Sequence, residues 1–584
     1  MREVSTAPLA DLSAYRNVTD LLTRRVDEAP DHVAFDVRDG ERWRPVTTAA
    51  FAAEVRAVAK GLLADGLQTG DAVAIMAPTR YEWAVADLAV WFAGGVVVPV
   101  YDSSAPSQVA AIVADAGVRV AFFGDERSRS ALTAAGVPTV LSLTRGLADL
   151  AARGGLVDDA VLERARTDAG PTSPATIVYT SGTSGTPKGV VLSHENFLGQ
   201  VLNIAAAYSD IVRADGSTMI FLPLAHVLAR GLQLICLASG MRIAHLSEPS
   251  EVVASLAELR PTFLVVVPRI LEKIAAAARA KAADKHLGRV WDAAVRTATE
   301  LARREEQIDD GQTPASSWSL RVRRRVFDAL FYRRIRALMG GRIGYVLSGG
   351  ATLPSRLSLL FRGMGVPVIE GYGLTETTAP LTGNLPGRIR SGTVGVPLPG
   401  STVRIADDGE VLAKGVGVFA GYRNADDDRD AFVDGFFRTG DLGRLDERGR
   451  LVLEGRVKDV VTTSGGKTVA PARWEAAIEE HPVISSAVTV GEGRPYLTAL
   501  IVLDQDTVTA ARGSAVALDD PDLRAEVQRA VDEANALVSR SEQVRRFALV
   551  FADAEDREIV TPTLKIRRRQ LLDRESGTID ALYL

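Results

Sequence analysis

Strand-like and helix-like stretches alternate along the first half of the chain. The alternating segments are 71–77 ("DAVAIMA"), 81–93, 96–101 ("VVVPVY"), 107–117 and 118–124 ("VRVAFFG"). Strands separated by helical stretches of this length are typical of a parallel sheet with helices packed on its faces. The apolar runs at 261–270 and 341–350 continue the pattern. We therefore expect an α/β fold.

The length of 584 residues is too great for one compact core and predicts at least two domains. After residue 400 the pattern changes to short hairpins, with turns at Asp408-Gly409 and Arg448-Gly449. An α+β stretch of small-domain size follows. We predict a large N-terminal domain over 1–456 and a small mobile C-terminal α+β domain over 457–584.

Composition excludes several classes of function. The hydrophobic fraction of 47% and charged fraction of 24% are those of an ordinary globular protein, and the net charge of −5 gives no footprint for nucleic acid. Cys236, the single cysteine, excludes a disulfide framework and is predicted to be a core residue. The N-terminus has no secretory pattern, and Trp83–Tyr101 reads as a helix running into a buried strand because it carries Asp87. We expect a cytoplasmic protein.

An arginine-rich segment, "LRVRRRVFDALFYRRIRALMG", spans 320–340. Helical spacing predicts one apolar face made of Val322, Val326, Phe327, Leu330, Phe331 and Leu338. Such a helix can lie on an anionic membrane, which would give a weak peripheral contact at the inner membrane face. Alternatively, and more commonly, it packs its apolar stripe on the rest of the protein.

The stretch "VYTSGTSGTPKGVVLSH", from Val178 to His194, has the composition of a phosphate cradle. It is not an NTPase P-loop, because Pro187-Lys188-Gly189 stands where Gly-Lys-Ser/Thr is required and a β-like run follows. A helix can start only at Ser193. We predict strand–loop–strand, with glycine amides, hydroxyls and one lysine facing the phosphates.

Four later stretches occur in a fixed order: "GYGLTETTAP" (371–380), "FFRTGDLG" (436–443), "LEGRVKDVVTTSGGKTVAP" (453–471) and "TPTLKIRRR" (561–569). Together with the loop they resemble the core motifs of the adenylate-forming, or acyl-activating, superfamily. "SGGATLP" (348–354) and "FLPLAHVLAR" (221–230) narrow the resemblance to bacterial long-chain fatty-acid–CoA ligases. The resemblance covers nearly the whole chain.

The resemblance implies a two-step reaction with Mg²⁺. A fatty-acid carboxylate attacks the α-phosphorus of ATP, giving acyl-AMP and pyrophosphate, and the thiol of coenzyme A then displaces AMP. The carboxylate is already ionised at neutral pH, so the first step needs no general base. It needs neutralisation of phosphate charge and alignment of the attacking oxygen, which lysines, hydroxyls and a metal ligand supply.

The resemblance also assigns the residues that bind the phosphates. The β- and γ-phosphates would be held by Thr180, Ser181, Gly182, Thr183, Ser184, Gly185, Thr186 and Lys188. Glu376 would be the Mg²⁺ ligand, with the hydroxyl of Thr180 as a second ligand, and Thr375 would bond the α-phosphate. Few protein oxygens plus the phosphates themselves is the usual arrangement for Mg²⁺.

The nucleoside is assigned in the same way. The backbone of Gly349, Gly350 and Ala351 would line the adenine, and Tyr372, followed by Gly373, would stack on it. Asp441 would accept both ribose hydroxyls, a geometry that suits a two-oxygen acceptor. Arg456 would reach the ribose as well.

The C-terminal motifs imply a second set of roles. Lys565 would be the catalytic lysine that bridges the α-phosphate and the carboxylate, although Thr563-Leu564 replaces the commoner Ser-Gly before it. Lys458 would be the hinge about which the small domain rotates between the two steps. Ser464, Gly465 and Gly466 would line the pantetheine tunnel of coenzyme A. Arg567–Arg569 either face solvent or meet the phosphates of coenzyme A.

His226 resembles a catalytic residue near the acyl carboxylate, although a histidine among apolar residues can equally be a satisfied core residue. Some long-chain ligases carry a tryptophan gate four residues later, but here that position is Arg230, so the acyl chain length stays open. The alternatives are a fatty acyl-AMP ligase or an aryl or medium-chain acyl-CoA ligase of the same superfamily. A catalytically idle, membrane-associated acyl-binding protein is disfavoured by the intact Lys188, Glu376, Asp441 and Lys565.

Overall fold

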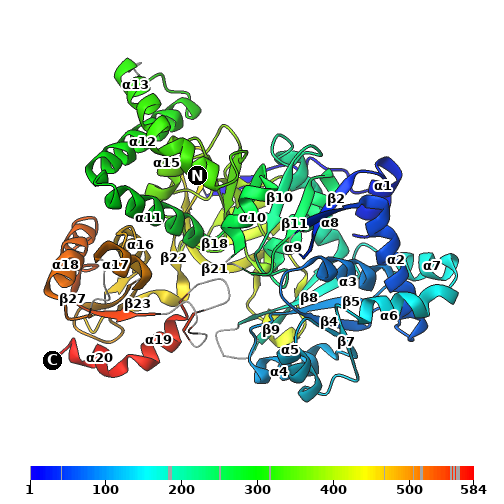
Figure 1. Cartoon of the computed structure of the whole chain (residues 1–584). Helices are drawn as coiled ribbons and strands as arrows, with labels where there is room; N and C mark the ends of the chain where they lie inside the picture. The colour runs from blue at the N-terminus through cyan, green and yellow to red at the C-terminus, as the bar shows by residue number, and fades with distance from the viewer. Residues whose placement is uncertain are drawn as a thin grey trace.

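Two large sheets with parallel centres lie at the core of the larger part of the molecule, with helices packed around them (Figure 1). The computed structural model describes residues 2–584 except 41, 182–186, 249–250, 315–316, 466, 504, 513–516, 553–555, 557–558 and 561–565. The α/β expectation is confirmed. The sheets differ from a purely parallel arrangement at their edges, where short connections force antiparallel pairs.

The seven-stranded sheet has the order β19-β9-β8-β5-β4-β6-β7. Its strands are β4 (Ala72–Met76), β5 (Val96–Val100), β6 (Val120–Phe123), β7 (Thr139–Ser142), β8 (Pro174–Ser181), β9 (Pro187–Ser193) and β19 (Gly421–Tyr422). β4, β5, β6, β7 and β8 run parallel, and β9 returns antiparallel to β8. The strands predicted at 71–77, 96–101 and 118–124 are confirmed.

The nine-stranded sheet has the order β16-β15-β14-β13-β12-β10-β11-β2-β3. Its strands are β2 (Val33–Asp39), β3 (Arg42–Thr47), β10 (Ser217–Ile220), β11 (Arg242–His245), β12 (Phe263–Val266), β13 (Tyr345–Ser348), β14 (Val368–Tyr372), β15 (Thr382–Gly383) and β16 (Val396–Pro397). β12 and β13 lie inside the predicted apolar runs 261–270 and 341–350.

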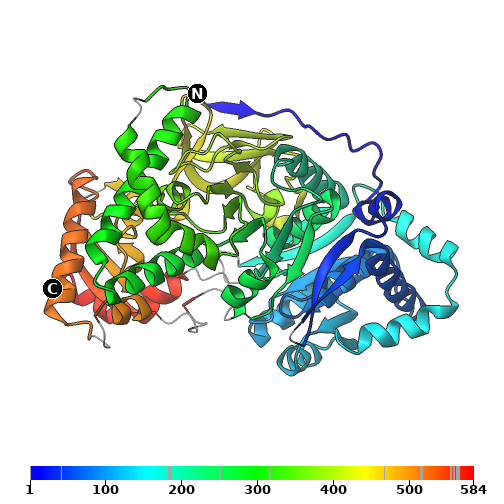
Figure 2. The ribbon, with the colours of Figure 1, turned by 45° about the horizontal axis from the view of Figure 1, so that its top comes forward.

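A third sheet of antiparallel hairpins follows residue 400. It contains β1 (Glu3–Ser5), β17 (Ser401–Ile405), β18 (Glu410–Gly415), β20 (Phe432–Val433), β21 (Phe436–Leu445) and β22 (Leu451–Arg456). Both predicted turns are confirmed, with Gly409 and Gly449 at φ +87° and +76°. The N-terminal segment crosses the molecule to pair β1 with β17 (Figure 2).

Helices cover both large sheets. Those of the seven-stranded half are α1 (Asp20–Glu28), α2 (Thr48–Ala64), α3 (Tyr81–Phe92), α4 (Pro106–Ala116), α5 (Glu126–Ala134), α6 (Gly146–Arg153), α7 (Asp159–Asp168) and α8 (His194–Ala207). The later ones are α9 (Val227–Ser239), α10 (Val252–Leu259), α11 (Pro268–Asp284), α12 (Gly288–Asp309), α13 (Trp318–Phe327), α14 (Arg333–Leu338) and α15 (Ser355–Gly363).

The apolar stretch Trp83–Tyr101 lies inside the fold, as predicted. Every residue of α3 except Glu82 is buried, and β5 is buried along its whole length. Within the described part of the chain, no helix is both long enough and apolar enough to cross a bilayer. Cys236 is buried in the same core, as predicted, and burial raises the pKa of its thiol.

A smaller α+β unit follows β22. It contains the hairpin β23 (Val461–Thr462) and β24 (Thr468–Val469), and the sheet β25 (Ile484–Val490), β26 (Leu497–Leu503) and β27 (Val544–Phe551). Its helices are α16 (Ala472–Ile478), α17 (Gln505–Arg512), α18 (Pro521–Ala536), α19 (Arg568–Arg574) and α20 (Ser576–Ala581). This unit has its own apolar core around Trp474 and Ile501, as a separately folding domain requires.

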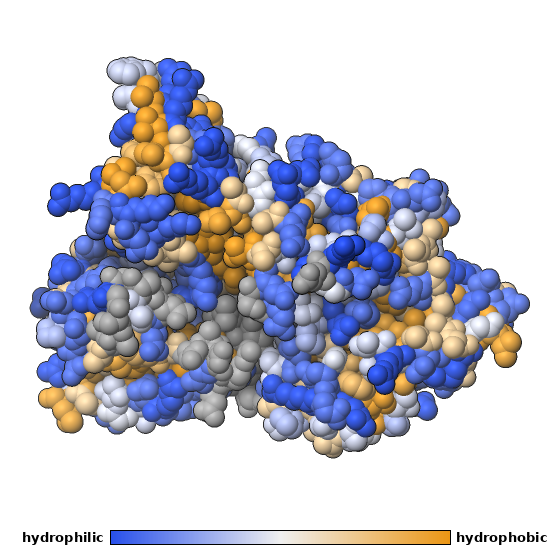
Figure 3. Space-filling model, viewed as in Figure 1, coloured by the Kyte–Doolittle hydropathy of each residue, from blue (hydrophilic) through white to orange (hydrophobic). Residues whose placement is uncertain are grey.

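The arginine-rich segment differs from its prediction. A π-helical turn at Asp328–Tyr332 separates α13 from α14 and shifts the register of the side chains. Phe327 and Phe331 pack on the core, whereas Val322, Val326, Leu330 and Leu338 are 47%, 50%, 39% and 49% exposed. The predicted single apolar face is therefore wrong: two of its six residues pack inward and four meet solvent, on the projection at the top of Figure 3.

Candidate active site

The predicted phosphate loop lies between two paired strands. β8 and β9 place Thr180 opposite Lys188. The side chain of Ser193 caps α8, accepting a hydrogen bond of 3.2 Å from the N–H of Asn196. The strand–loop–strand prediction is thus confirmed. Gly182, Thr183, Ser184, Gly185 and Thr186 lie outside the described residues, and only the backbone of Ser181 is described.

Lys188 is held by two residues that sequence reasoning missed. Its Nζ lies 2.8 Å from Oδ1 of Asp427 and 5.2 Å from the centre of the Tyr422 ring. Tyr422 arrives here because β19 pairs with β9, opposite Val190. A phosphate binding at Lys188 would compete with Asp427 for the ammonium. Only the acidic run at 426–428 gave a signal in the sequence, and it did not indicate this pairing.

Glu376 lies in a 3₁₀ turn, Thr375–Thr377, directly beyond β14. This turn contacts β9, and the hydroxyl of Tyr422 donates to Oε1 of Glu376 over 3.0 Å. Burial raises the pKa of the Glu376 carboxyl, while hydrogen bonds, including that from Tyr422, and the charge of Arg456 lower it. Tyr422 therefore joins Glu376 to the lysine end of the phosphate loop.

A buried carboxylate whose ionised form is disfavoured is a position that a bound cation would stabilise. The described residues contain no group of three or more His, Cys, Asp or Glu side chains that could hold a metal ion by themselves. A single carboxylate fits Mg²⁺, which takes few protein ligands and completes its shell with phosphate oxygens and water. Glu376, with the hydroxyl of Thr180, has the oxygen chemistry that this cation requires.

Asp441 and Arg456 face each other across the β21–β22 hairpin. Nε of Arg456 donates to Oδ1 of Asp441 over 2.7 Å, and the hydroxyl of Tyr372 donates to Oδ2 over 2.6 Å. Each carboxylate oxygen has two lone pairs, so Asp441 can still accept two ribose hydroxyls. Burial, and then the charge of Asp441, raise the pKa of Tyr372 well above its usual value, which keeps the phenol protonated as a donor.

Three predicted site glycines also have structural reasons for lacking a side chain. Gly349 follows β13 and packs against Leu228, whose Cδ2 would lie 3.3 Å from an added Cβ. Gly350 has a φ of +80°, and a Cβ on Gly373 would lie 2.8 Å from the Cα of Pro380. Gly349–Ala351 therefore presents bare backbone at the carboxyl end of a parallel strand, where α/β folds bind ligands.

His226 caps the N-terminus of α9. Its Nδ1 accepts a hydrogen bond of 3.1 Å from the N–H of Leu228, so the neutral ring is assigned its proton on Nε2. Since Leu228 also contacts Gly349, His226 lies at the same sheet edge as the predicted adenine segment. A proton on Nε2 makes the ring a donor suited to a carboxylate.

Arg230, at the predicted gate position, is a buried structural cation. Its Nε and Nη2 bind the two oxygens of Asp87 at 2.9 and 2.5 Å, and Nη1 donates to the hydroxyl of Thr176 over 2.7 Å. The guanidinium lies 4.6 Å from the Trp91 ring centre. A side chain that is 1% exposed and held on three sides does not swing as a gate.

The predicted hinge lies beside the predicted ribose site. Lys458 belongs to a 3₁₀ turn, Val457–Asp459, directly after Arg456. Burial, with help from the charge of Arg456, lowers the pKa of Lys458, and Asp459 and Asp441 oppose this. The backbone of Gly455 passes so close to α16 that an added Cβ would lie 3.1 Å from that of Ala472.

The remaining C-terminal predictions are only partly described. Ser464 and Gly465 lie in the turn between β23 and β24, where Ser464 N–H donates to the carbonyl of Arg494 over 2.9 Å. Gly466 and Lys565 lie outside the described residues. Arg568, from the run predicted either to face solvent or to meet coenzyme A, binds Glu475 at 2.9 Å and the carbonyl of Thr489 at 2.7 Å.

Two family models match the chain. The family described as "AMP-binding enzyme" matches residues 22–423, and "AMP-binding enzyme C-terminal domain" matches residues 458–584. The chain belongs to the AMP-binding enzyme family. It is 37% identical over 604 aligned residues to a protein of Mycobacterium bovis named long-chain-fatty-acid–CoA ligase FadD15, and the alignment covers 100% of both chains.

Solved structures of AMP-binding enzymes share the two-domain fold. A Mycobacterium tuberculosis fatty acyl CoA synthetase superposes with a TM-score of 0.63 at 24% identity, covering 96% of this chain and 99% of that one. The o-succinylbenzoate coenzyme A synthetase of Bacillus subtilis, in complex with ATP and magnesium ion, superposes with a TM-score of 0.67 at 20% identity, covering 94% and 98%.

Proposed function

We propose that this AMP-binding enzyme is an ATP-dependent long-chain fatty-acid–CoA ligase. The observation that carries the proposal is the convergence of three predicted sites. Tyr422 connects Lys188 of the phosphate loop to Glu376, and the charges of Arg456 and Asp441 act on Glu376 in turn. The residues predicted to bind phosphate, metal and ribose therefore lie within electrostatic reach of one another. The full-length relative named as a long-chain-fatty-acid–CoA ligase supports the same substrate class.

In the proposed first step, a carboxylate oxygen forms a bond to the α-phosphorus and the bond to pyrophosphate breaks. Lys188 and the loop amides would hold the departing phosphates, and Thr375 would bond the α-phosphate. Asp441 and Arg456 would fix the ribose, and Gly349–Ala351 would line the adenine with Tyr372 against it. Positioning and charge stabilisation of this kind supply most of the catalysis in phosphate chemistry.

Glu376 and Thr180 would hold Mg²⁺, which when bound neutralises phosphate charge. His226 would donate from Nε2 to the fatty-acid carboxylate and orient it. Lys565 would bridge the carboxylate and the α-phosphate. In the second step the thiol sulfur of coenzyme A would attack the acyl carbon and release AMP, with Ser464, Gly465 and Gly466 lining the approach.

We propose that residues 1–456 and 457–584 are the two domains and that the small one rotates about Lys458 between the steps. The position of Lys458 in a short turn between two separately cored units supports this. We also propose that the protein acts in the cytoplasm with no nucleic-acid partner, and that it meets the inner membrane face only peripherally, where long-chain acids concentrate.

The deciding experiment is release of AMP with saturated fatty acids of different chain length, each with and without coenzyme A. Release that requires a long-chain acid and coenzyme A together is the expected result, and the profile gives the preferred length. Acid-dependent exchange of pyrophosphate into ATP without coenzyme A-dependent turnover would instead assign an acyl-AMP ligase. Preference for aryl or medium-chain acids would overturn the substrate class.

A further inference from the structure

The exposed part of the arginine-rich segment forms a defined surface. Trp318, Val322, Val326 and Leu330 recur every fourth residue and so lie in one row along the helix. Trp318 is 73% exposed, and the three aliphatic residues are 47%, 50% and 39% exposed. We call these four residues the apolar row. A row of large exposed apolar side chains on a projecting helix marks an interaction site.

The opposite side of the same segment packs against the protein. Leu320 and Tyr332 are 2% and 1% exposed, and the Tyr332 hydroxyl donates to the carbonyl of Ala294 on α12 over 2.6 Å. The ring of Phe331 meets that of Trp291 edge-on at 5.5 Å. The segment is therefore fixed by its inner side, and the outward direction of the apolar row is set by the fold.

The surface around the apolar row is strongly basic. Residues 318–338 contain seven arginines and one acid, Asp328, which binds Arg336 at 2.7 Å. The arginines at 321, 323, 324, 325, 333 and 334 are exposed. Helical spacing places Arg321 and Arg325 along one edge of the row and Arg323 along the other. In Figure 3 the apolar side chains of the projection run between polar ones.

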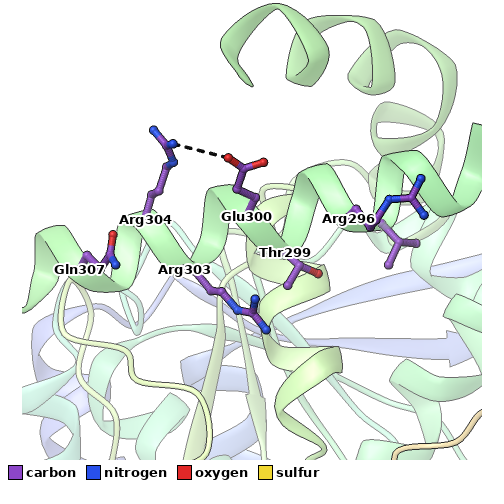
Figure 4. Close-up of a pocket in the computed structure, with 7 residues that line it drawn as sticks. Arg296, Thr299, Glu300, Arg303, Arg304 and Gln307 are labelled. Atoms are coloured by element: carbon purple, nitrogen blue, oxygen red, sulfur yellow. Dashed lines mark hydrogen bonds and ion pairs between the residues drawn. The ribbon is translucent and has the colours of Figure 1, made fainter. Parts of the chain in front are cut away.

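One side of the supporting helix α12 carries further positive charge, although the whole helix has four arginines and five acids. A surface hollow of about 610 Å³ along α12 is lined by Arg296, Arg303 and Arg304 (Figure 4). Its one carboxylate, Glu300, binds Arg304 at 3.5 Å and Arg323 of α13 at 3.1 Å. The acids in the next turns of α12 are also paired, Glu305 and Asp309 with Arg362. The charge around the projection is therefore net positive.

We propose that the apolar row and its flanking arginines dock the protein on an anionic phospholipid bilayer. The apolar row would enter the boundary between headgroups and acyl chains, and the arginines would pair with lipid phosphates. A protein partner would not require six exposed arginines around the apolar row. An anionic bilayer complements both features, with phosphates for the arginines and acyl chains for the apolar row. The biological use of this surface rests on the proposed function. Docking would bring the enzyme to the long-chain fatty acids that are dissolved in the membrane.

The test measures sedimentation of the full-length protein with vesicles, without ATP or acid. Vesicles rich in phosphatidylglycerol should carry the protein down and pure phosphatidylcholine vesicles should not. High salt should release it, because the Debye length falls from about 10 Å at 0.1 M to about 3 Å at 1 M. Trp318 is the most exposed of the six tryptophans, so a lipid-dependent blue shift of fluorescence should vanish in Trp318→Phe.

Matched variants separate this surface from general effects. Replacing the flanking Arg321, Arg323 and Arg325 with Gln should weaken binding roughly a hundredfold, since each juxtamembrane cation typically contributes about fivefold. Replacing the exposed Arg127, Arg529 and Arg540 with Gln makes the same charge change elsewhere and should have little effect. Val326→Asp should abolish binding, whereas Val161→Asp, at a helical valine 47% exposed, should not.

Activity towards a water-soluble acid is measured in parallel for every variant. Retained activity with lost vesicle binding would assign the surface to docking alone, and vesicle binding by a protein without activity would reject only the proposed reaction. Equal binding to neutral and anionic vesicles, or equal loss in both matched sets, would overturn the docking proposal. So would concentration-dependent self-association that Val326→Asp removes, which would assign the row to a second copy of this chain.

Discussion

Tyr422 is the residue on which the proposed site most depends and which no motif singles out. Its ring lies below the ammonium of Lys188, and its hydroxyl donates to Glu376. The hydroxyl favours the ionised form of Glu376 against the effect of burial. One side chain thus contacts both the predicted phosphate-binding lysine and the predicted metal ligand.

Tyr422→Phe should weaken Mg²⁺-dependent adenylation about tenfold or more near neutral pH, because a hydrogen bond to a charged group contributes about 1.5–3 kcal/mol. Removing the hydroxyl raises the pKa of Glu376 further, so more of the carboxyl is protonated and binds cation poorly. Raising the pH should therefore reduce the deficit. The measurement is the Mg²⁺ dependence of acid-dependent pyrophosphate exchange at two pH values.

Tyr208→Phe provides the control, because it removes a buried hydroxyl that donates to the carbonyl of Asn384. It should leave the Mg²⁺ dependence unchanged. A deficit in Tyr422→Phe that is the same at low and high pH would contradict the role assigned to the hydroxyl.

At the scale of elements, a buried ion pair joins α3, α9 and β8. Asp87 and Arg230 are 0% and 1% exposed, and Thr176 completes the set. Burial of His194 and, as the second cause, the positive charge of Arg230 lower the pKa of His194 to about 3. Charges taken out of water in this way are tolerated only when each has its partner.

Asp87→Asn should destabilise the protein by about 3–5 kcal/mol, because it leaves the Arg230 cation buried and unpaired. The double variant Asp87→Leu with Arg230→Met should recover most of that loss. Thermal unfolding measures both. Asp407→Asn, which breaks the exposed pair with Arg2, should change stability by less than about 1 kcal/mol. A double variant as unstable as the single one would contradict the ion-pair explanation.

Glu370 of β14 gives the second prediction for an element. Burial, with the charge of Glu306 adding to it, raises the pKa of Glu370 to about 8 from 4.5. Below the pKa that Glu370 has in the unfolded chain, both the folded and the unfolded protein hold the proton. The stabilising contribution of the protonated carboxyl is then complete. Between the two values the folded protein retains a proton that the unfolded chain releases, so stability falls by roughly 1.4 kcal/mol per pH unit.

Glu370→Gln should therefore flatten the decline in unfolding temperature between about pH 5 and about 8, as followed by thermal unfolding across that range. Glu447→Gln, at an exposed position, should leave the decline unchanged. If the unfolding temperature of the wild type and of Glu370→Gln declined in parallel with pH, the Glu370 carboxyl would not be the cause of the decline.

At the scale of the whole molecule, charged side chains of the two cored units act on one another. Burial raises the pKa of Glu480 in the C-terminal unit, and the charge of Arg356 on α15 lowers it. The turn containing Lys458 is the covalent connection between the units. A rotation about that turn would exchange which face of the C-terminal unit meets the nucleotide site.

Lys565→Ala should reduce acid-dependent pyrophosphate exchange by at least about a hundredfold, which is typical for loss of one charge-stabilising group. Thioester formation from supplied acyl-AMP and coenzyme A should be spared, because only the first step uses this lysine. Arg540→Ala, at an exposed arginine of the same unit, should spare both steps. Equal losses in the two half-reactions would contradict the assignment of Lys565.

The sequence by itself determined the α/β class, the hairpins after residue 400, the strand–loop–strand around the phosphate loop and the family. These depend on local periodicity, turn glycines and the order of motifs, all of which are written along the chain. The residue roles in the nucleotide site stay predictions, and Lys565 with the central loop residues lies outside the described part of the chain.

Only the tertiary structure decided which groups meet. Tyr422 reaches Glu376 because β19 pairs with β9, Arg230 finds Asp87 143 positions away, and the π-helical turn divides the arginine-rich segment into a buried and an exposed side. Helical periodicity shows that a segment has an apolar face but not which part of that face the core covers. Contacts between distant residues depend on how sheets and helices pack, and a single sequence does not encode that in any local pattern.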